Sequence, residues 1–224
     1  MSTKATSSSE ITSNYHAIVE RVSRIGGNRR VTVVAVSKTQ ASSAIELAYR
    51  GGVCDFGENY GSELAKKAKE LSGLPITWHM IGALQSKNIL QIAPFVSLWH
   101  SISRRKELDI LGQITPAPDA LIQVNYSDEP GRNGVLASEV EDLVKYGLDL
   151  RINMVGLMVV TPVVPVADRV KIFRDTYRLG SSLGLSEFSM GMSDDFESAV
   201  QEGSTIVRVG RAVFGKRAQK ADQS

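Results

Sequence analysis

The chain has 224 residues, of which 42% are hydrophobic and 22% charged, and its formal net charge is +2. This length supports one large domain or two small ones, and no break in composition marks a boundary between two. The charge is too balanced to indicate binding to nucleic acid or to a membrane surface.

The first ten residues are rich in serine and threonine and lack the apolar segment of a secretory signal, so we expect a disordered tail over residues 1–10. Apolar residues then recur at helical spacing over residues 11–25, and Gly26-Gly27 provides a stop signal. This pattern predicts an amphipathic helix, which we expect to pack over one end of the domain.

The next segment is an almost purely β-branched run, Val31–Val36, followed by Ser37, Lys38 and Thr39. Such a run indicates a strand buried on both faces, as in a parallel sheet. Lys38 then stands at the carboxyl end of the strand, where α/β sheets bind ligands. Apolar surroundings would lower its pKa, and a neutral amine can form a Schiff base with a carbonyl group. Lys38 alone does not establish a Schiff-base site, because a lysine in this position more often extends its ammonium group to solvent.

Apolar runs and helical segments alternate along the rest of the chain. The expected strands cover residues 31–36, 53–59, 75–82, 96–102, 119–126, 152–160, 187–192 and 205–214. The expected helices between them cover residues 41–50, 61–71, 86–93, 104–111, 137–146, 167–183 and 194–201. Eight strands alternating with helices close a (β/α)₈ TIM barrel. A doubly wound open sheet is the alternative, but it would place a glycine fingerprint where this chain has Ser37-Lys38-Thr39-Gln40.

The single cysteine, Cys54, excludes an internal disulfide, suits a reducing compartment, and is interpreted as a small apolar core residue. His79 lies within the third apolar run and is interpreted as a hydrogen-bonded core histidine. Three scattered histidines and one cysteine give no zinc-ligand spacing. No apolar run is long enough to cross a bilayer.

In a barrel, the strand exits face one common mouth. Exits seven and eight carry the run Ser189–Ser193 and the glycine Gly210, which offer hydroxyl and backbone N–H groups to a phosphate. Simpler interpretations exist for both, because Ser193 could cap the following helix and Gly210 could only allow close strand packing. A shielded lysine opposite a phosphate site suits pyridoxal 5′-phosphate (PLP), and it equally permits a class I aldolase acting on a phosphorylated sugar.

Six sequence blocks stand in one order between residues 15 and 215: Val34–Thr39, Phe56–Tyr60, Trp78–Gln85, Gly156–Met158, Ser189–Asp195 and Val207–Gly215. Together they resemble the pyridoxal phosphate homeostasis protein family, often called YggS-type. The resemblance implies a single PLP-binding TIM barrel over residues 11–216, similar to the N-terminal domain of alanine racemase, with a polar tail over residues 217–224.

The resemblance also implies roles for individual residues. PLP would be bound as an internal aldimine on one lysine, with its phosphate in a cradle after strands seven and eight. The implied cofactor-binding residues are Lys38 for the aldimine, Asn59 for the ring pocket, Ser189, Gly210 and Arg211 for the phosphate, and Arg208 at the cofactor. The chain departs from the family at Arg211, where a small Ser or Thr is usual, and at Ser103, where an acidic residue is common.

Members of this family bind PLP without established turnover, and are thought to buffer it or deliver it to PLP-dependent apoenzymes, affecting amino-acid and keto-acid balance. Racemisation needs a second acid–base group, which racemases take from another domain, and only about ten polar residues follow Phe214 here. An arginine near the pyridine nitrogen would also weaken the electron sink. We therefore expect a cytoplasmic, monomeric PLP-binding protein without nucleic-acid or membrane partners. A weakly active racemase or lyase, and an interaction module that senses cofactor supply, are the alternatives.

Overall fold

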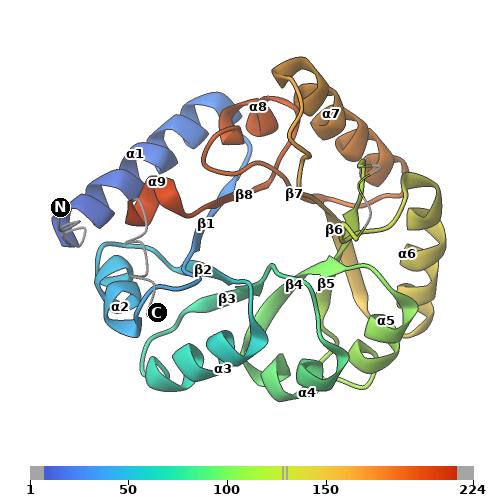
Figure 1. Cartoon of the computed structure of the whole chain (residues 1–224), viewed down its shortest axis with the longest axis horizontal. Coiled ribbons are helices and arrows are strands. Elements are labelled where there is room, and N and C mark those ends of the chain that lie inside the picture. Colours follow the sequence, from blue (N-terminus) through green and yellow to red (C-terminus); the bar gives the residue numbers. More distant parts are fainter. Residues whose placement is uncertain (1–7, 128, 130, 216–224) are drawn as a thin grey trace, which may run out of the picture.

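The structure is a computed structural model that describes residues 8–127, 129 and 131–215. Eight parallel strands form a closed barrel in chain order, and β8 pairs with β1 to complete it (Figure 1). The predicted TIM barrel is confirmed. The strands are β1 (Thr32–Val36), β2 (Asp55–Glu58), β3 (Thr77–Met80), β4 (Val96–Ile102), β5 (Asp119–Val124), β6 (Asn153–Val159), β7 (Glu187–Ser189) and β8 (Ile206–Val209).

Helices surround the barrel on the outside, as Figure 1 shows. They are α1 (Ser8–Gly26), α2 (Ser42–Arg50), α3 (Gly61–Glu70), α4 (Ile89–Ile92), α5 (Arg105–Leu111), α6 (Val140–Asp149), α7 (Val166–Ser182), α8 (Phe196–Gln201) and α9 (Arg211–Phe214). Three short 3₁₀ turns add to them, η1 (Ser86–Asn88), η2 (Ala93–Phe95) and η3 (Ala137–Glu139). Apolar side chains of the strands pack against the buried stripes of these helices to form the core.

Helix α1 differs from the prediction in its start and its position. It begins at Ser8, so residues 8–10 belong to the helix and not to a disordered tail, while residues 1–7 lie outside the described part. The helix packs in the outer layer beside α2, α8 and α9, and not over one end of the barrel (Figure 1). Its buried side chains form one apolar stripe, which packs against the outer side of the domain. Asn14 also donates a hydrogen bond to the carbonyl oxygen of Val213 in α9 at 3.2 Å. Because α9 is short, α1 completes the helical ring between β8 and β1.

Three local predictions are wrong. Strand eight ends at Val209, and the expected remainder turns into helix α9, because Val213 and Phe214 donate backbone hydrogen bonds to the carbonyl oxygen of Gly210. Ser193 does not cap α8, which begins at Phe196. Cys54 is exposed, since β2 begins only at Asp55. The expected polar tail over residues 217–224 lies outside the described residues.

Within the described residues, no helix combines the length and the apolar character that a membrane span requires.

Candidate functional site

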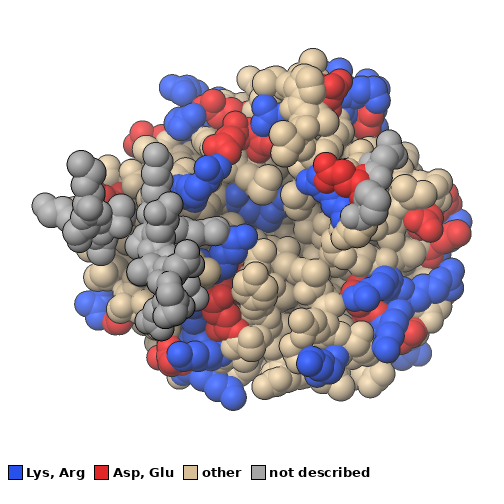
Figure 2. All heavy atoms as spheres, in the orientation of Figure 1, with Lys and Arg blue, Asp and Glu red and all other residues tan. Residues whose placement is uncertain are grey.

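A cavity of about 280 Å³ opens at the carboxyl ends of the strands. Its lining includes five of the six predicted cofactor-binding residues: Lys38, Asn59, Arg208, Gly210 and Arg211. The remaining lining residues are Val36, Ile81, Val160, Met192, Ser193 and Asp194. Figure 2 shows lysine and arginine side chains in the centre of the face that looks towards the viewer. The volume is close to the lower end of the range for small-ligand pockets, about 300–1,000 Å³.

Lys38 is half-buried and follows the end of β1, as the sequence predicts. The main chain is fixed on both sides of it. Ser37 donates its N–H to the carbonyl oxygen of Gly57 at 3.0 Å, and Thr39, which has a positive φ of 67°, donates its N–H to Oε1 of Glu63 at 2.7 Å. Lys38 is therefore presented to the cavity from a loop whose backbone is held in place.

A buried ion pair lies beneath this loop. Lys67 of α3 lies 2.7 Å from the carbonyl oxygen of Ser37, 2.7 Å from Oε1 of Glu58 and 2.6 Å from Oε1 of Glu63. The hydroxyl of Ser37 also donates to Oε1 of Glu58 at 2.6 Å. Burial raises the pKa of Glu58, although the bonds from Lys67 and Ser37 act in the opposite direction.

Sequence reasoning missed this pair, because Glu58 and Lys67 lie on different elements, β2 and α3, and no local pattern joins them. A signal was present in α3, where Lys67 shares the buried face with Leu64 and Ala68. A lysine within the apolar stripe of a helix is rarely buried without an acidic partner.

Arg208 of β8 lines the cavity although its side chain is almost fully buried. Its Nη1 donates to the carbonyl oxygen and to Oγ of Ser189 at 2.6 and 2.7 Å, and its Nη2 donates to the carbonyl oxygen of Val159 at 2.8 Å. Burial lowers the pKa of Arg208 to about 10, while the charge of Asp195 raises it. Arg208 is therefore a cation at neutral pH.

Ser189 does not line the cavity. It is fully buried, and its hydroxyl contacts Arg208 and His100. Within the run Ser189–Ser193, the residues that reach the cavity are Met192 and Ser193. The predicted assignment of Ser189 to a phosphate cradle is therefore not supported by its position, and Ser189 instead holds Arg208.

The loop after β8 carries Gly210 and Arg211. Their backbone N–H groups have no acceptor among the residues that the structure describes, and they lie at the cavity. Ser193 lies opposite, and its Oγ accepts a weak hydrogen bond from the N–H of Ala212 at 3.4 Å. The side chain of Arg211 forms an ion pair with Asp194, and both side chains are largely exposed at the rim.

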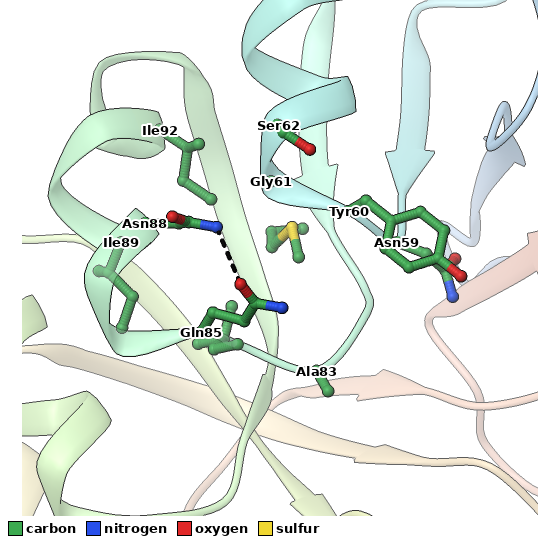
Figure 3. A pocket seen from close by; sticks show the side chains of 11 residues that line it. Asn59, Tyr60, Gly61, Ser62, Ala83, Gln85, Asn88, Ile89 and Ile92 are labelled. Atoms are coloured by element: carbon green, nitrogen blue, oxygen red, sulfur yellow. Dashed lines mark hydrogen bonds between the residues drawn. The ribbon is translucent and has the colours of Figure 1, made fainter.

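Asn59 follows β2 and separates the main cavity from a second hollow of only about 60 Å³. In Figure 3, Asn59 and Tyr60 lie on one side of that hollow, and Asn88 and Ile89 lie on the other. The side-chain oxygen of Asn59 is buried and has no hydrogen-bond partner within the described chain. A buried acceptor without a donor is costly, so the hydrogen bonding of the Asn59 amide is incomplete within the described residues.

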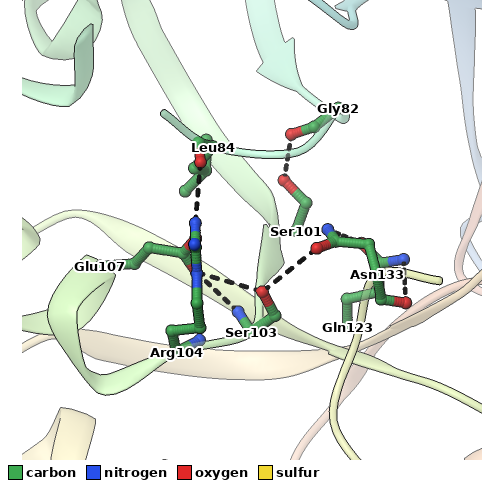
Figure 4. A network of polar contacts seen from close by, with 8 residues as sticks. All are labelled: Gly82, Leu84, Ser101, Ser103, Arg104, Glu107, Gln123 and Asn133. Carbon is green, nitrogen blue, oxygen red and sulfur yellow. Dashed lines mark hydrogen bonds and ion pairs between the residues drawn. The ribbon is translucent and has the colours of Figure 1, made fainter. Parts of the chain in front are cut away.

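The loops after β4 and β5 are joined by polar contacts at another part of the mouth (Figure 4). Glu107 is buried, and its Oε2 accepts hydrogen bonds from the N–H groups of Ser103 and Arg104 at 2.8 and 3.1 Å. Gln123 and Asn133 pair with each other, and the Oγ of Ser103 lies 3.5 Å from Oδ1 of Asn133. Glu107 thus supplies a carboxylate next to Ser103, where the family commonly has an acidic side chain.

His79 is buried and hydrogen-bonded, as predicted, to His100 at 2.9 Å and to Asp55 at 3.0 Å. Within the described residues, no three His, Cys, Asp or Glu side chains gather in a way that could hold a metal ion.

A scan against protein-family models finds no match. A curated relative from Pseudomonas aeruginosa, named pyridoxal phosphate homeostasis protein, is 39% identical over 199 residues, which are 84% of this chain and 85% of the relative. The chain belongs to the pyridoxal phosphate homeostasis protein family. The resemblance predicted from the six sequence blocks is thereby confirmed.

Solved structures share the fold of this chain. PipY from Synechococcus elongatus PCC7942, solved with PLP bound, is 29% identical and superposes with a TM-score of 0.82, covering 92% of this chain and all of PipY. Alanine racemase from Corynebacterium glutamicum is 17% identical and superposes with a TM-score of 0.72, covering 96% of this chain and 63% of the racemase. The superposition on alanine racemase confirms the predicted TIM-barrel fold.

Proposed function

We propose that this protein binds PLP in the cavity at the mouth of its barrel, through a Schiff base with Lys38, and takes part in intracellular PLP homeostasis. The proposal is supported above all by the convergence of Lys38, Arg208, Gly210 and Arg211 on one cavity. Membership of a family whose relatives are named for PLP homeostasis, and the PLP bound to PipY, support it further.

The residues of the cavity fit the chemistry of PLP. Lys38 supplies the amine, and the cationic side chains of Arg208 and Arg211 suit an anionic ligand. The N–H groups of Gly210 and Arg211 and the hydroxyl of Ser193 are donors that a phosphate can use. Asn59 adds a polar amide side chain to the lining of the same cavity.

PLP supplies an electron sink when bound, and the residues around it determine whether that sink is used. Arg208 is protonated at neutral pH and donates only, so a pyridine nitrogen next to it would stay unprotonated. Asp194 is the one carboxylate that lines the described cavity, and it is paired with Arg211. We infer that the protein stores or delivers PLP and does not turn substrates over efficiently, and that the racemase or lyase alternative is the less favoured.

The test is to add PLP to the purified protein, record the visible absorption of a Schiff base, reduce with borohydride and map the modified residue by mass spectrometry. We expect a yellow protein that carries the label on Lys38, and a Lys38→Ala variant that binds PLP without the Schiff-base band. Lys87→Ala, a lysine outside the lining of the cavity, is the matched control. A wild-type protein that stays colourless, or a label on another lysine, would overturn the proposal.

The proposed setting is the cytoplasm, with PLP-dependent apoenzymes as recipients and the protein acting as a monomer. Transfer can be tested by mixing the PLP-loaded protein with an apoenzyme and measuring the return of that enzyme's activity. The comparison is free PLP at the same total concentration. Chiral analysis after incubation with single amino acids tests the racemase alternative.

A further inference from the structure

A continuous chain of hydrogen bonds crosses the interior of the barrel below the cavity. Nη1 of Arg208 donates to Oγ of Ser189 at 2.7 Å, and this oxygen lies 2.8 Å from Nδ1 of His100. Nε2 of His100 lies 2.9 Å from Nδ1 of His79, and Nε2 of His79 lies 3.0 Å from Oδ1 of Asp55. The four residues from β3, β4, β7 and β8 are buried, and the Asp55 side chain is 27% exposed.

The protons of this chain can be counted. Four contacts join five residues, and each contact needs one proton. Arg208 only donates and the Asp55 carboxylate only accepts, a neutral imidazole supplies one proton and accepts one, and a serine hydroxyl supplies one proton and can accept two. Arg208, Ser189 and the two neutral rings therefore supply four protons for four contacts. An imidazolium at either ring would add a fifth proton, and His100 would then donate from Nδ1 to Ser189, which would leave the buried Ser189 hydroxyl proton without an acceptor among the described residues.

Only one arrangement satisfies all four contacts and also gives the proton of the Ser189 hydroxyl an acceptor. Arg208 can only donate, so Nδ1 of His100 is the acceptor that the described residues offer to the Ser189 hydroxyl proton, and His100 then donates from Nε2 to Nδ1 of His79. His79 then donates from Nε2 to Asp55. A neutral His100 agrees with its environment, since burial and the charge of the neighbouring Arg208 lower the pKa of His100 well below its ordinary value.

We propose that His79 and His100 are positioning residues that act through Ser189 to hold the guanidinium of Arg208 in its orientation at the cavity. The carboxylate of Asp55 fixes the tautomer of His79, which fixes that of His100, so that the Ser189 hydroxyl proton points to His100 and the lone pairs of its oxygen are left to Arg208. Arg208 has five N–H groups. Three of them are used by Ser189 and Val159, and the rest have no partner among the described residues, so they are available to a ligand. This role rests on the proposed function, because the ligand that meets Arg208 is PLP.

The tautomers can be measured without PLP. Long-range ¹⁵N–¹H correlation spectra of the full, cofactor-free chain distinguish protonated from unprotonated imidazole nitrogens. The rings can be assigned by replacing His16, the third histidine of the sequence. We expect both His79 and His100 to be neutral near pH 7.5, with the proton on Nε2. A proton on Nδ1 of either ring, or an imidazolium, would overturn the proposal.

The positioning role is tested by a double-mutant cycle on PLP affinity. His100→Gln keeps a polar atom towards His79 but removes the acceptor for Ser189, whereas His100→Asn keeps an acceptor at the position of Nδ1. We expect His100→Gln to weaken PLP binding about fivefold, the effect of one hydrogen bond, and His100→Asn to bind within about twofold of wild type. In an Arg208→Gln background the effect of His100→Gln should vanish.

Equal losses from His100→Gln in both backgrounds would show that His100 acts on folding alone and would overturn the positioning role. Circular dichroism and a thermal melt of each variant identify a protein that has not folded. In that case the comparison uses His79→Asn, which keeps an acceptor at Nδ1, and His79→Leu, which removes it, with the same expected order of affinities. Failure of wild-type protein to bind PLP would instead contradict the proposed function. The tautomer measurement would still show whether the hydrogen bonds from Arg208 to Asp55 are formed as proposed.

Discussion

Lys67 holds the main chain next to Lys38, because its ammonium group lies 2.7 Å from the carbonyl oxygen of Ser37. The same group contacts Glu58 and Glu63, so one buried cation joins β2, α3 and the loop that carries the proposed Schiff-base lysine. The amine that reacts and the amine that supports it are thus different residues on different elements. Lys67 is buried and hydrogen-bonded to Ser37, Glu58 and Glu63, whereas Lys38 lines the cavity.

We expect Lys67→Met to destabilise the fold. Methionine replaces the apolar stem of the lysine but leaves the Glu58 carboxylate buried without its cation, and breaking a buried pair costs about 3–5 kcal/mol. Urea denaturation should show a loss of this size in the free energy of unfolding. The control is Lys66→Met, whose ammonium group is exposed and 3.9 Å from Glu70, and which should change the stability by less than about 1 kcal/mol. Equal stabilities of the two variants would contradict this role of Lys67.

Glu58 should make the free energy of unfolding decrease as the pH rises, which is the opposite of the usual effect of a carboxylate. Burial raises its pKa above the ordinary value of 4.5, so the folded protein binds this proton more tightly than the unfolded chain does. The contribution of Glu58 to the free energy of unfolding is therefore largest at low pH and is lost as the pH rises through the raised pKa. Glu58→Gln should remove this loss, which can be measured by urea denaturation from below pH 4.5 to neutrality.

The matched control for Glu58 is Glu141→Gln. Hydrogen bonding to Lys145 lowers the pKa of Glu141, so its contribution is present above the ordinary value and lost as the pH falls. The two substitutions should therefore change the pH slope of stability in opposite directions. An unchanged slope in Glu58→Gln would show that burial does not govern the titration of Glu58.

The sequence predicted the barrel because its apolar runs are long, separate and regularly spaced. β4 has the predicted bounds, Val96–Ile102, and Lys38 follows β1 as expected. The prediction failed where an apolar run contained two elements. Apolar residues occur along the whole segment 205–214, interrupted by Arg208, Gly210 and Arg211, and periodicity over so few residues does not separate the end of β8 from the single turn of α9.

The resemblance to a known family predicted more residues of the site than the pattern of residue types along the chain did. Ser189 and Ser193 have the same chemistry and lie four residues apart, and only the place where β7 ends decides that Ser193 reaches the cavity and Ser189 does not. The partnership of Glu58 with Lys67 depends in the same way on how β2 meets α3. Contacts of this kind arise from strand register and helix rotation, which local sequence does not determine.

Gly82 should tolerate no side chain, because the loop after β3 meets Asn59 there. A Cβ atom at this position would lie 2.1 Å from the carbonyl oxygen of Asn59. We expect Gly82→Ala to lower the free energy of unfolding by about 1–3 kcal/mol and to weaken PLP binding by displacing Asn59. The control is Gly73→Ala, where a Cβ meets nothing within 4 Å, and which should be neutral or stabilising by up to about 1 kcal/mol. Wild-type stability and PLP affinity in Gly82→Ala would show that the two loops can separate freely.

Arg211 should act on the affinity for PLP more than on stability. Its side chain is 60% exposed and pairs with Asp194, which is 71% exposed, so Arg211→Ser should change the free energy of unfolding by less than about 1 kcal/mol. The same substitution removes one cation from the cavity, and we expect it to weaken PLP binding several-fold at low salt. The difference should shrink as salt rises, because the screening length falls from about 30 Å at 0.01 M to about 10 Å at 0.1 M ionic strength. Arg50→Ser removes a cation that is paired with Glu46 on α2 and does not line the cavity, so it should leave the affinity unchanged. If Arg211→Ser and wild type bind PLP equally at low salt, the charge of Arg211 is cancelled by Asp194 and does not reach the ligand.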